Sequence, residues 1–185
     1  MQSKKTQTIY DYNLKKSSSI NSSLFSYLFA ELIFYLNCRD EKKTLQQKLN
    51  EVGFPIGQRI LELCALRNNY VRFPKIETIL LFTQNEIWNY LFGSKADEVD
   101  KSPDDDNEYR IYDNKAIINK YLATKGEQMN CGDFVAGIIQ GILYTAGFPA
   151  KVDTTVIDDE NKGVIERKVA YIIKFEHQVI KREGS

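Results

Sequence analysis

The sequence has few of the residues that form disulfide bonds or bind metal ions. Its 185 residues include three cysteines, at positions 38, 64 and 131, and one histidine. No two cysteines have the short spacing of a zinc site or of a paired disulfide framework. There is also no glycine-rich phosphate loop with a lysine. We therefore expect no metal, no cofactor and a reducing, intracellular environment.

An excess of charge of either sign is also lacking, as are long hydrophobic runs. Lys+Arg and Asp+Glu are 25 each, which argues against a nucleic-acid-binding protein, because that would need a clustered basic face. The longest apolar run, residues 24–36, contains Glu31 and is too short to span a bilayer. Met1 leads into polar residues rather than a secretory signal. These features predict a cytoplasmic protein.

The composition predicts one domain with a tail. Residues 1–21 are polar and partly basic, so we expect a disordered tail, with contact to acidic lipid as the alternative. Residues 22–183 carry the apolar patterns and are expected to form a single domain.

A helix at the centre of this domain is predicted between residues 130 and 152. Asn130 can cap its first turn, with Asp133 near the positive end of the helix dipole. Gly147 and Pro149 supply the end signals.

The body of this helix has almost no polar face, so it must be covered on all sides. Its apolar residues are Phe134, Val135, Ile138, Ile139, Ile142 and Leu143. Gly137 and Gly141, four residues apart, lower helix propensity and are best explained by close backbone approach on one side.

The first helix is expected to begin at Ser22 or Ser23, and apolar residues cover more of its surface than one core requires. The surplus favours a subunit interface, with a wholly buried helix as the alternative. The candidate interface residues are Leu24, Leu28, Leu32 and Tyr35 on this helix, and Ile60 and Leu63 further along the chain.

Two short helices are predicted next. Thr44 and Gln47 form a capping box for a helix over residues 45–52, which Gly53 is expected to end. Pro55 is expected to start the second helix.

Another helix is predicted to begin at Pro74 and to end at Gly93. The acidic stretch from Asp97 to Glu108 lacks the ligand spacing of a calcium loop. We expect it to be a solvated loop, with contact to a basic partner as the alternative.

The remaining segments alternate in the manner of strands, and the predicted strands are residues 108–112, 150–157 and 164–175. Residues 116–122 fit either a strand or a helix, residues 158–163 are expected to form a turn, and residues 178–183 a short helix. The predicted fold class is α+β, with N-terminal helices packed against a small twisted antiparallel sheet and one central buried helix.

Only one pair of residues suggests catalysis. Cys131 lies at a predicted helix N-terminus, where the dipole lowers the pKa of a thiol, and the following pattern resembles papain-like amidases and acyltransferases. Such an enzyme needs a histidine beside the thiol, and His177 is the sole candidate. His177 lies past the last predicted strand in a charged context, so we favour a structural Cys131 and keep a cysteine acyl hydrolase as the alternative.

Several segments, in this order along the chain, resemble the small subunits of the trafficking protein particle (TRAPP) complex, most of all the subunit 5 branch of that family. They are Ile56–Leu61, Ile87–Asp97, Ile118–Tyr121, Asn130–Ile139 with Gly147–Val152, and Ile172–Glu176. The resemblance covers roughly residues 20–183.

The resemblance implies a non-catalytic scaffold subunit that forms a heterodimer with a paralogous subunit through its N-terminal helices. The complex of this family tethers vesicles between endoplasmic reticulum and Golgi and promotes nucleotide exchange on a Rab-family GTPase. Contact with the GTPase and peripheral attachment to cis-Golgi and endoplasmic reticulum membranes are expected only through the complex. Without its partner, the apolar helix face allows a homodimer.

One departure from the family matters. A paralogous subunit carries an acylated cysteine before its third helix, and the matching residues here, 70–74, contain no cysteine. Cys64 lies about two turns earlier. We therefore do not expect acylation at this position.

Overall fold

The computed structural model describes residues 22–39, 42–69, 72–103, 105, 107–114, 116, 131–157 and 168–183. The predictions for the tail, the Asn130 cap, most of residues 116–122 and the turn at 158–163 lie outside these residues.

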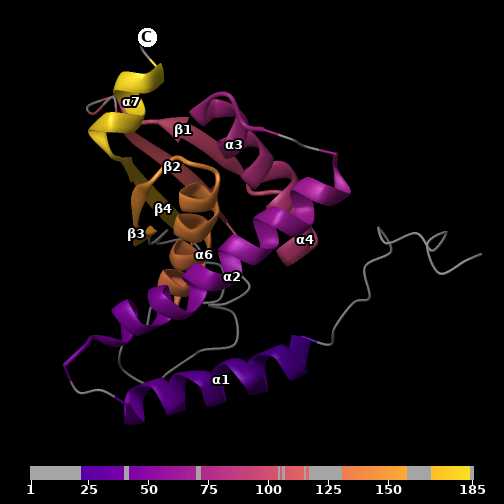
Figure 1. The fold of residues 1–185 in the computed structure, drawn as a ribbon. Helices are drawn as coiled ribbons and strands as arrows, with labels where there is room; N and C mark the ends of the chain where they lie inside the picture. The colour runs from indigo at the N-terminus through magenta and orange to yellow at the C-terminus, as the bar shows by residue number, and fades with distance from the viewer. Residues whose placement is uncertain are drawn as a thin grey trace, which may run out of the picture.

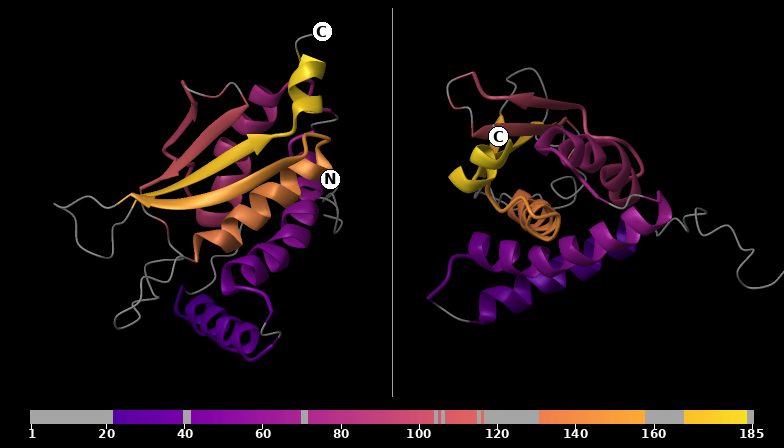
Figure 2. Two further views of the ribbon diagram at one scale, coloured as in Figure 1. Left: turned by 90° about the vertical axis from the view of Figure 1, so that its left-hand side faces the viewer. Right: turned by 45° about the horizontal axis from the view of Figure 1, so that its top comes forward.

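The described residues form an α+β fold, as predicted, with the helices packed on one face of a four-stranded sheet (Figures 1 and 2). The helical elements are α1 Ser22–Cys38, α2 Leu45–Arg67, α3 Ile76–Phe82, the π-helical segment η2 Thr83–Ile87, α4 Trp88–Phe92, α6 Gly132–Thr145 and α7 His177–Glu183. The strands are β1 Glu98–Lys101, β2 Glu108–Asp113, β3 Ala150–Ile157 and β4 Lys168–Phe175, in the order β1-β2-β4-β3. Helix α6 lies between α2 and the sheet (Figure 2).

The sheet is antiparallel throughout, and the predicted pairing of β3 with β4 is confirmed, with Ala150 opposite Phe175. Alternate residues of β4 face the helices and are buried, as their spacing predicts: Val169, Tyr171, Ile173 and Phe175. On the other face, Glu108 accepts hydrogen bonds from Arg110 and pairs with Lys174 across the strands. These contacts lower the pKa of the Glu108 carboxyl, the Arg110 hydrogen bond most of all.

The acidic segment from Asp97 to Glu108 was expected from the sequence to be a solvated loop, and this expectation is wrong for part of it. Residues 98–101 form β1, which pairs with β2 so that Asp100 lies opposite Arg110. This strand is short, mostly exposed and at the sheet edge, where charged side chains oppose pairing with other chains. Because β1 is short and mostly charged, its sequence did not indicate a strand.

The prediction of two helices between residues 45 and 67 is wrong. Helix α2 runs unbroken through Gly53 and Pro55, and the Thr44–Gln47 capping box is present at its start. Pro55 lies on the exposed side, where a missing backbone hydrogen bond is tolerated best. Gly53 allows the close packing of α2 against α6 and does not end the helix.

Helices α2 and α6 touch backbone to backbone at four glycines, and this confirms the close approach predicted for Gly137 and Gly141. A Cβ atom on Gly137 would lie 2.2 Å from the Asn50 carbonyl oxygen, and one on Gly141 would lie 2.0 Å from that of Phe54. The contact is reciprocal, because Cβ atoms on Gly53 and Gly57 would lie 2.2 and 2.0 Å from the oxygens of Phe134 and Ile138. The paired numbers rise together, so the two helices run parallel.

The helical run after Pro74 ends at Gly93 as predicted, because Gly93 adopts a left-handed φ of 76°. Within it the π-helical segment η2 adds a wide turn, and the Thr83 hydroxyl donates to the Ile79 carbonyl. Gln84 contacts the backbone of Ala96, which joins this run to the start of β1.

The C-terminal helix α7, whose existence was predicted, fastens two other helices at their ends. The Glu183 carboxylate accepts a hydrogen bond from the backbone N–H of Ile76, at the start of α3. Arg182 donates to the Gly147 carbonyl, 3.0 Å away, just past the end of α6. Each charge complements the dipole of the helix end that it meets.

We expect Gly57→Ala to lower the free energy of unfolding by about 3 kcal/mol or more, because the new methyl group would collide with backbone rather than with a movable side chain. Denaturant titration measures this. Gly147→Ala is the matched control: nothing lies within 4 Å of a Cβ at that position, so only backbone strain of about 1–2 kcal/mol is expected. Equal losses in the two variants would contradict the backbone contact.

Candidate interaction surface

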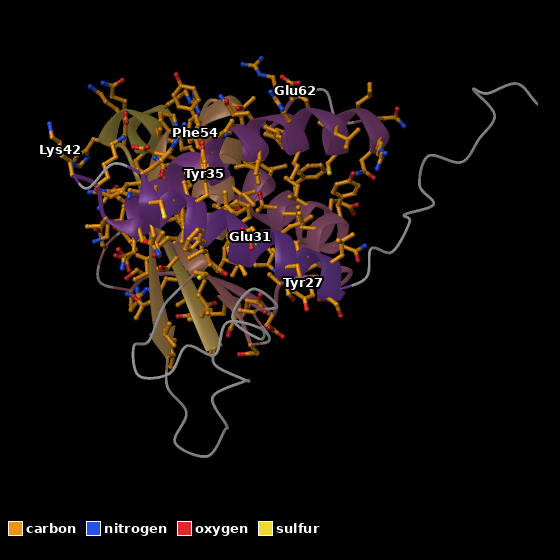
Figure 3. The ribbon with its side chains drawn as sticks, turned by 90° about the horizontal axis from the view of Figure 1, so that it is seen from below. Tyr27, Glu31, Tyr35, Lys42, Phe54 and Glu62 are labelled. Atoms are coloured by element: carbon orange, nitrogen blue, oxygen red, sulfur yellow. The ribbon has the colours of Figure 1, made fainter. Side chains whose placement is uncertain are left out.

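Helix α1 has one face in the core and an opposite face that is apolar but exposed. Phe29, Ile33 and Leu36 are buried, and the Phe29 ring meets that of Phe134 on α6 edge-on at 5.3 Å. Phe25, 38% exposed, stacks on the buried Phe29. The exposed apolar side chains of the opposite face, with their exposed fractions, are Leu24 at 54%, Tyr27 at 76%, Leu28 at 64%, Phe34 at 68% and Tyr35 at 50%. We call these five residues, together with Glu31, the outer face of α1; Figure 3 shows Tyr27, Glu31 and Tyr35 along it.

The six residues predicted for an interface fall into two groups. Leu24, Leu28 and Tyr35 lie on the outer face. Leu32 and Ile60 are half-buried against the core, and Leu63 is also half-buried. The structure therefore places three of the predicted side chains on one exposed surface and turns the others partly inward.

Two residues of the outer face, Tyr27 and Phe34, were missed from the sequence. Because α1 is apolar almost all round, the sequence does not say which side faces the core. Helical spacing could have identified them. Glu31 is the one residue of α1 that must face water or a partner, and Tyr27 and Phe34 lie four and three positions from it, on the same side of the helix.

The end of α1 is held by a buried lysine on α2. The Lys48 side chain is 8% exposed, and its Nζ donates to the carbonyl oxygens of Leu36, at 2.8 Å, and Arg39. These carbonyls belong to the last turn of the helix and beyond, where a positive charge complements the dipole. Lys48 thus fixes the C-terminal end of α1 and, with it, the direction of the outer face.

The structure does not bring Cys131 and His177 together. Cys131 precedes α6, whereas His177 follows Glu176, whose N–H donates to the carbonyl of Pro149 beyond the other end of that helix. The 14 residues of α6 separate these ends by about 21 Å. His177 is exposed.

The environment of Cys131 also disfavours the reactive thiolate form. The residue is fully buried, and burial, with a smaller effect from the Asp133 carboxylate, raises the pKa of its thiol to about 12. A thiol in this state is a poor nucleophile near neutral pH. Asp133 itself accepts a hydrogen bond from the Thr154 hydroxyl, 2.9 Å away, which joins the start of α6 to β3.

The described residues offer neither a metal site nor a membrane-spanning helix. No three or more His, Cys, Asp or Glu side chains gather there in a way that could hold a metal ion. Within the same part of the chain, no helix combines the length and the apolar character needed to cross a bilayer. The outer face of α1 is therefore the strongest candidate site.

Comparison with known proteins agrees with the resemblance read from the sequence. The family described as "Transport protein particle (TRAPP) component" matches residues 25–176. A Dictyostelium discoideum protein named trafficking protein particle complex subunit 5 is 41% identical over 189 residues, covering 98% of this chain and 100% of its own. The Homo sapiens protein of the same name is 33% identical over 170 residues, covering 90% of this chain and 86% of its own.

A solved structure shares the fold. It is a trafficking protein particle complex subunit 3 from Naegleria fowleri, covalently bound to palmitic acid, with a TM-score of 0.66 and 13% identity. The match covers 84% of this chain and 95% of that one. At this identity the likeness concerns the fold alone.

We expect Cys131 to resist alkylation by iodoacetamide near neutral pH until the chain is unfolded, because its thiol is buried and protonated. Peptide mass spectrometry before and after denaturation measures this, and the exposed Cys38 is the internal control that should react in the folded protein. Labelling of Cys131 at the rate of Cys38 would revive the acyl hydrolase hypothesis.

We expect Lys48→Met to loosen α1, because the variant keeps the length of the side chain but leaves the carbonyls of Leu36 and Arg39 without their donor. Local opening of the last turn should become easier by about 1–3 kcal/mol. Amide hydrogen exchange of α1 measures this, with α6 as the internal reference. Lys43→Met is the control, since Lys43 pairs with Glu51 on the surface and such pairs contribute about 0–1 kcal/mol.

Proposed function

Since this chain belongs to the transport protein particle (TRAPP) component family, we propose that it is a scaffold subunit of a TRAPP complex and docks on a paralogous subunit through the outer face of α1. Its likeness to subunit 5 proteins over nearly the whole chain supports this placement within the family.

The single observation that carries the docking proposal is the exposure of α1. Of the eleven large hydrophobic side chains that are exposed among the described residues, six lie on this one helix. Monomeric proteins rarely keep such a contiguous apolar surface in water, and large patches of this kind mark interaction sites. The half-buried Leu32, Ile60 and Leu63 are proposed to flank the contact rather than to form its centre.

The proposed mechanism is surface complementarity. Tyr27, Phe34 and Tyr35 are aromatic, and aromatic side chains supply much of the binding energy at the centre of protein interfaces. A paralogous subunit would cover them and exclude water, while α2 and α6 hold α1 in place behind. Each subunit then extends the assembly without performing chemistry itself.

Under this proposal the chain acts in vesicle transport between endoplasmic reticulum and Golgi. It is cytoplasmic, and it reaches cis-Golgi and endoplasmic reticulum membranes and a Rab-family GTPase only through the assembled complex, which promotes nucleotide exchange. The separation of Cys131 from His177 supports a non-catalytic role. The absence of a cysteine from residues 70–74 supports leaving acylation at that position out of the proposal.

The test is complex formation by a variant of the outer face. We expect Leu28→Asp to abolish the one-to-one complex with a paralogous subunit, because Leu28 is 64% exposed and a carboxylate there would have to be desolvated on docking. Size-exclusion chromatography with light scattering measures the mass of the chain alone and mixed with each paralogue in turn.

Leu81→Asp is the matched control. Leu81 is 53% exposed and lies on α3, at the opposite end of the molecule from α1 (Figure 1), so its complex should keep the wild-type mass. A Leu28→Asp chain that still forms the complex would refute the outer face of α1 as the docking surface. A wild-type chain that binds no paralogue would refute the scaffold role itself.

A further inference from the structure

The outer face of α1 contains one charged residue. Glu31 is the sole side chain of α1, Ser22 to Cys38, that carries a charge at neutral pH, and it is exposed. Its helical neighbours three and four positions away are Tyr27, Leu28, Phe34 and Tyr35. The carboxylate therefore stands in the middle of the apolar surface rather than at its rim, as Figure 3 shows for Tyr27, Glu31 and Tyr35.

No cation among the described residues pairs with this carboxylate. The described acids that pair with lysine or arginine side chains include Glu51, Glu108 and Asp153. The nearest basic residue along the chain, Arg39, instead lies over the ring of Tyr35 at 4.7 Å. In the free subunit, water solvates Glu31.

Docking changes this balance. A partner that covers Tyr27, Leu28 and Tyr35 also covers Glu31 and removes its water. A desolvated carboxylate strongly opposes association unless the partner supplies a positive charge with hydrogen bonds. The face is thus complementary to a helix surface that is apolar and carries one basic side chain near its centre.

A second copy of this chain does not offer that surface. Residue 30 is the midpoint of α1, so antiparallel packing of two α1 helices along their full length would place the two Glu31 residues about two residues apart, or about 3 Å along the axis. Like charges at that spacing repel.

A shifted pairing fails for a different reason. Helix α1 ends at Cys38, so bringing Glu31 opposite Arg39 of the second copy would carry Leu28 and Leu24 past the end of that copy's α1. This part of the apolar surface would then stay uncovered.

We infer that Glu31 selects the partner: it makes the outer face of α1 specific for a paralogous helix surface that carries a basic residue, and it disfavours a homodimer. This inference rests on the proposed docking function, and it adds the chemistry of the partner to it. A charge that rejects the wrong partner while binding the right one is a general device for specificity.

The test uses the full chain and the paralogous subunit that gives the one-to-one complex. Glu31→Gln keeps the shape of the side chain and removes its charge. We expect its affinity for the paralogue to fall by at least about tenfold, because the basic residue of the partner would be left unpaired. The decrease of affinity with added salt should also become weaker in this variant, a change that loss of packing alone would not cause.

Self-association is measured in parallel by sedimentation equilibrium. Glu31→Leu should strengthen the homodimer by at least about tenfold, since it removes the repulsion and extends the apolar face. Glu98→Gln is the matched control, because Glu98 is an exposed carboxylate on β1, at the far edge of the sheet order from β3. It should leave both affinities within about twofold of wild type.

The outcomes separate this inference from the proposed function. If Glu31→Gln binds the paralogue as tightly as wild type while Leu28→Asp does not bind, the docking surface stands and the partner lacks the inferred basic residue. If Glu31→Leu self-associates no more than wild type, the exclusion of the second copy is overturned. Since Glu31 is exposed, the thermal midpoint of each variant should match wild type, which shows that the chain is folded.

Discussion

Two helices of this protein touch backbone to backbone, and the position of every other layer depends on that contact. Gly53 and Gly57 on α2 interlock with Gly137 and Gly141 on α6, and no residue with a side chain fits at these positions. The close approach leaves the two remaining sides of α6 for the sheet and for α1. It also explains why α2 continues past a glycine and a proline: packing along its whole length outweighs two unfavourable local preferences.

The helix that we propose for docking is held in a different way. Helix α1 relies on side chains, with Phe29 against Phe134 and the Lys48 ammonium on its last carbonyls. These contacts use one face of the helix and leave the opposite one exposed. The glycine contact fixes the positions of α2 and α6, and these helices support α1, whose outer face the described residues leave uncovered.

Much of the fold follows from the sequence, because α6, β3 and β4 carry strong periodic patterns with clear end signals. The sequence was misleading where a residue has two uses. Gly53 and Pro55 together resemble a helix break, but Gly53 allows α6 to pack closely and Pro55 lies on the exposed side of α2. The acidic residues of β1 resemble a loop, but they lie on a strand at the edge of the sheet. Half of the predicted site residues lie on the outer face. The rest could not be assigned, because an apolar helix does not reveal its core side until its neighbours are placed.

Because the C-terminal helix α7 contacts the ends of α3 and α6, some of their native contacts can form only late in synthesis. The carboxylate that caps the start of α3 belongs to Glu183, 107 residues further along the chain from Ile76. Strand β4, which lies between β2 and β3 in the sheet and pairs with both, also comes late in the chain. A chain emerging from the ribosome therefore holds α2 and α3 long before it holds the residues that close them. The native contacts of α3 can be completed only after α7 has been synthesised, and until then the apolar faces of these helices stay uncovered.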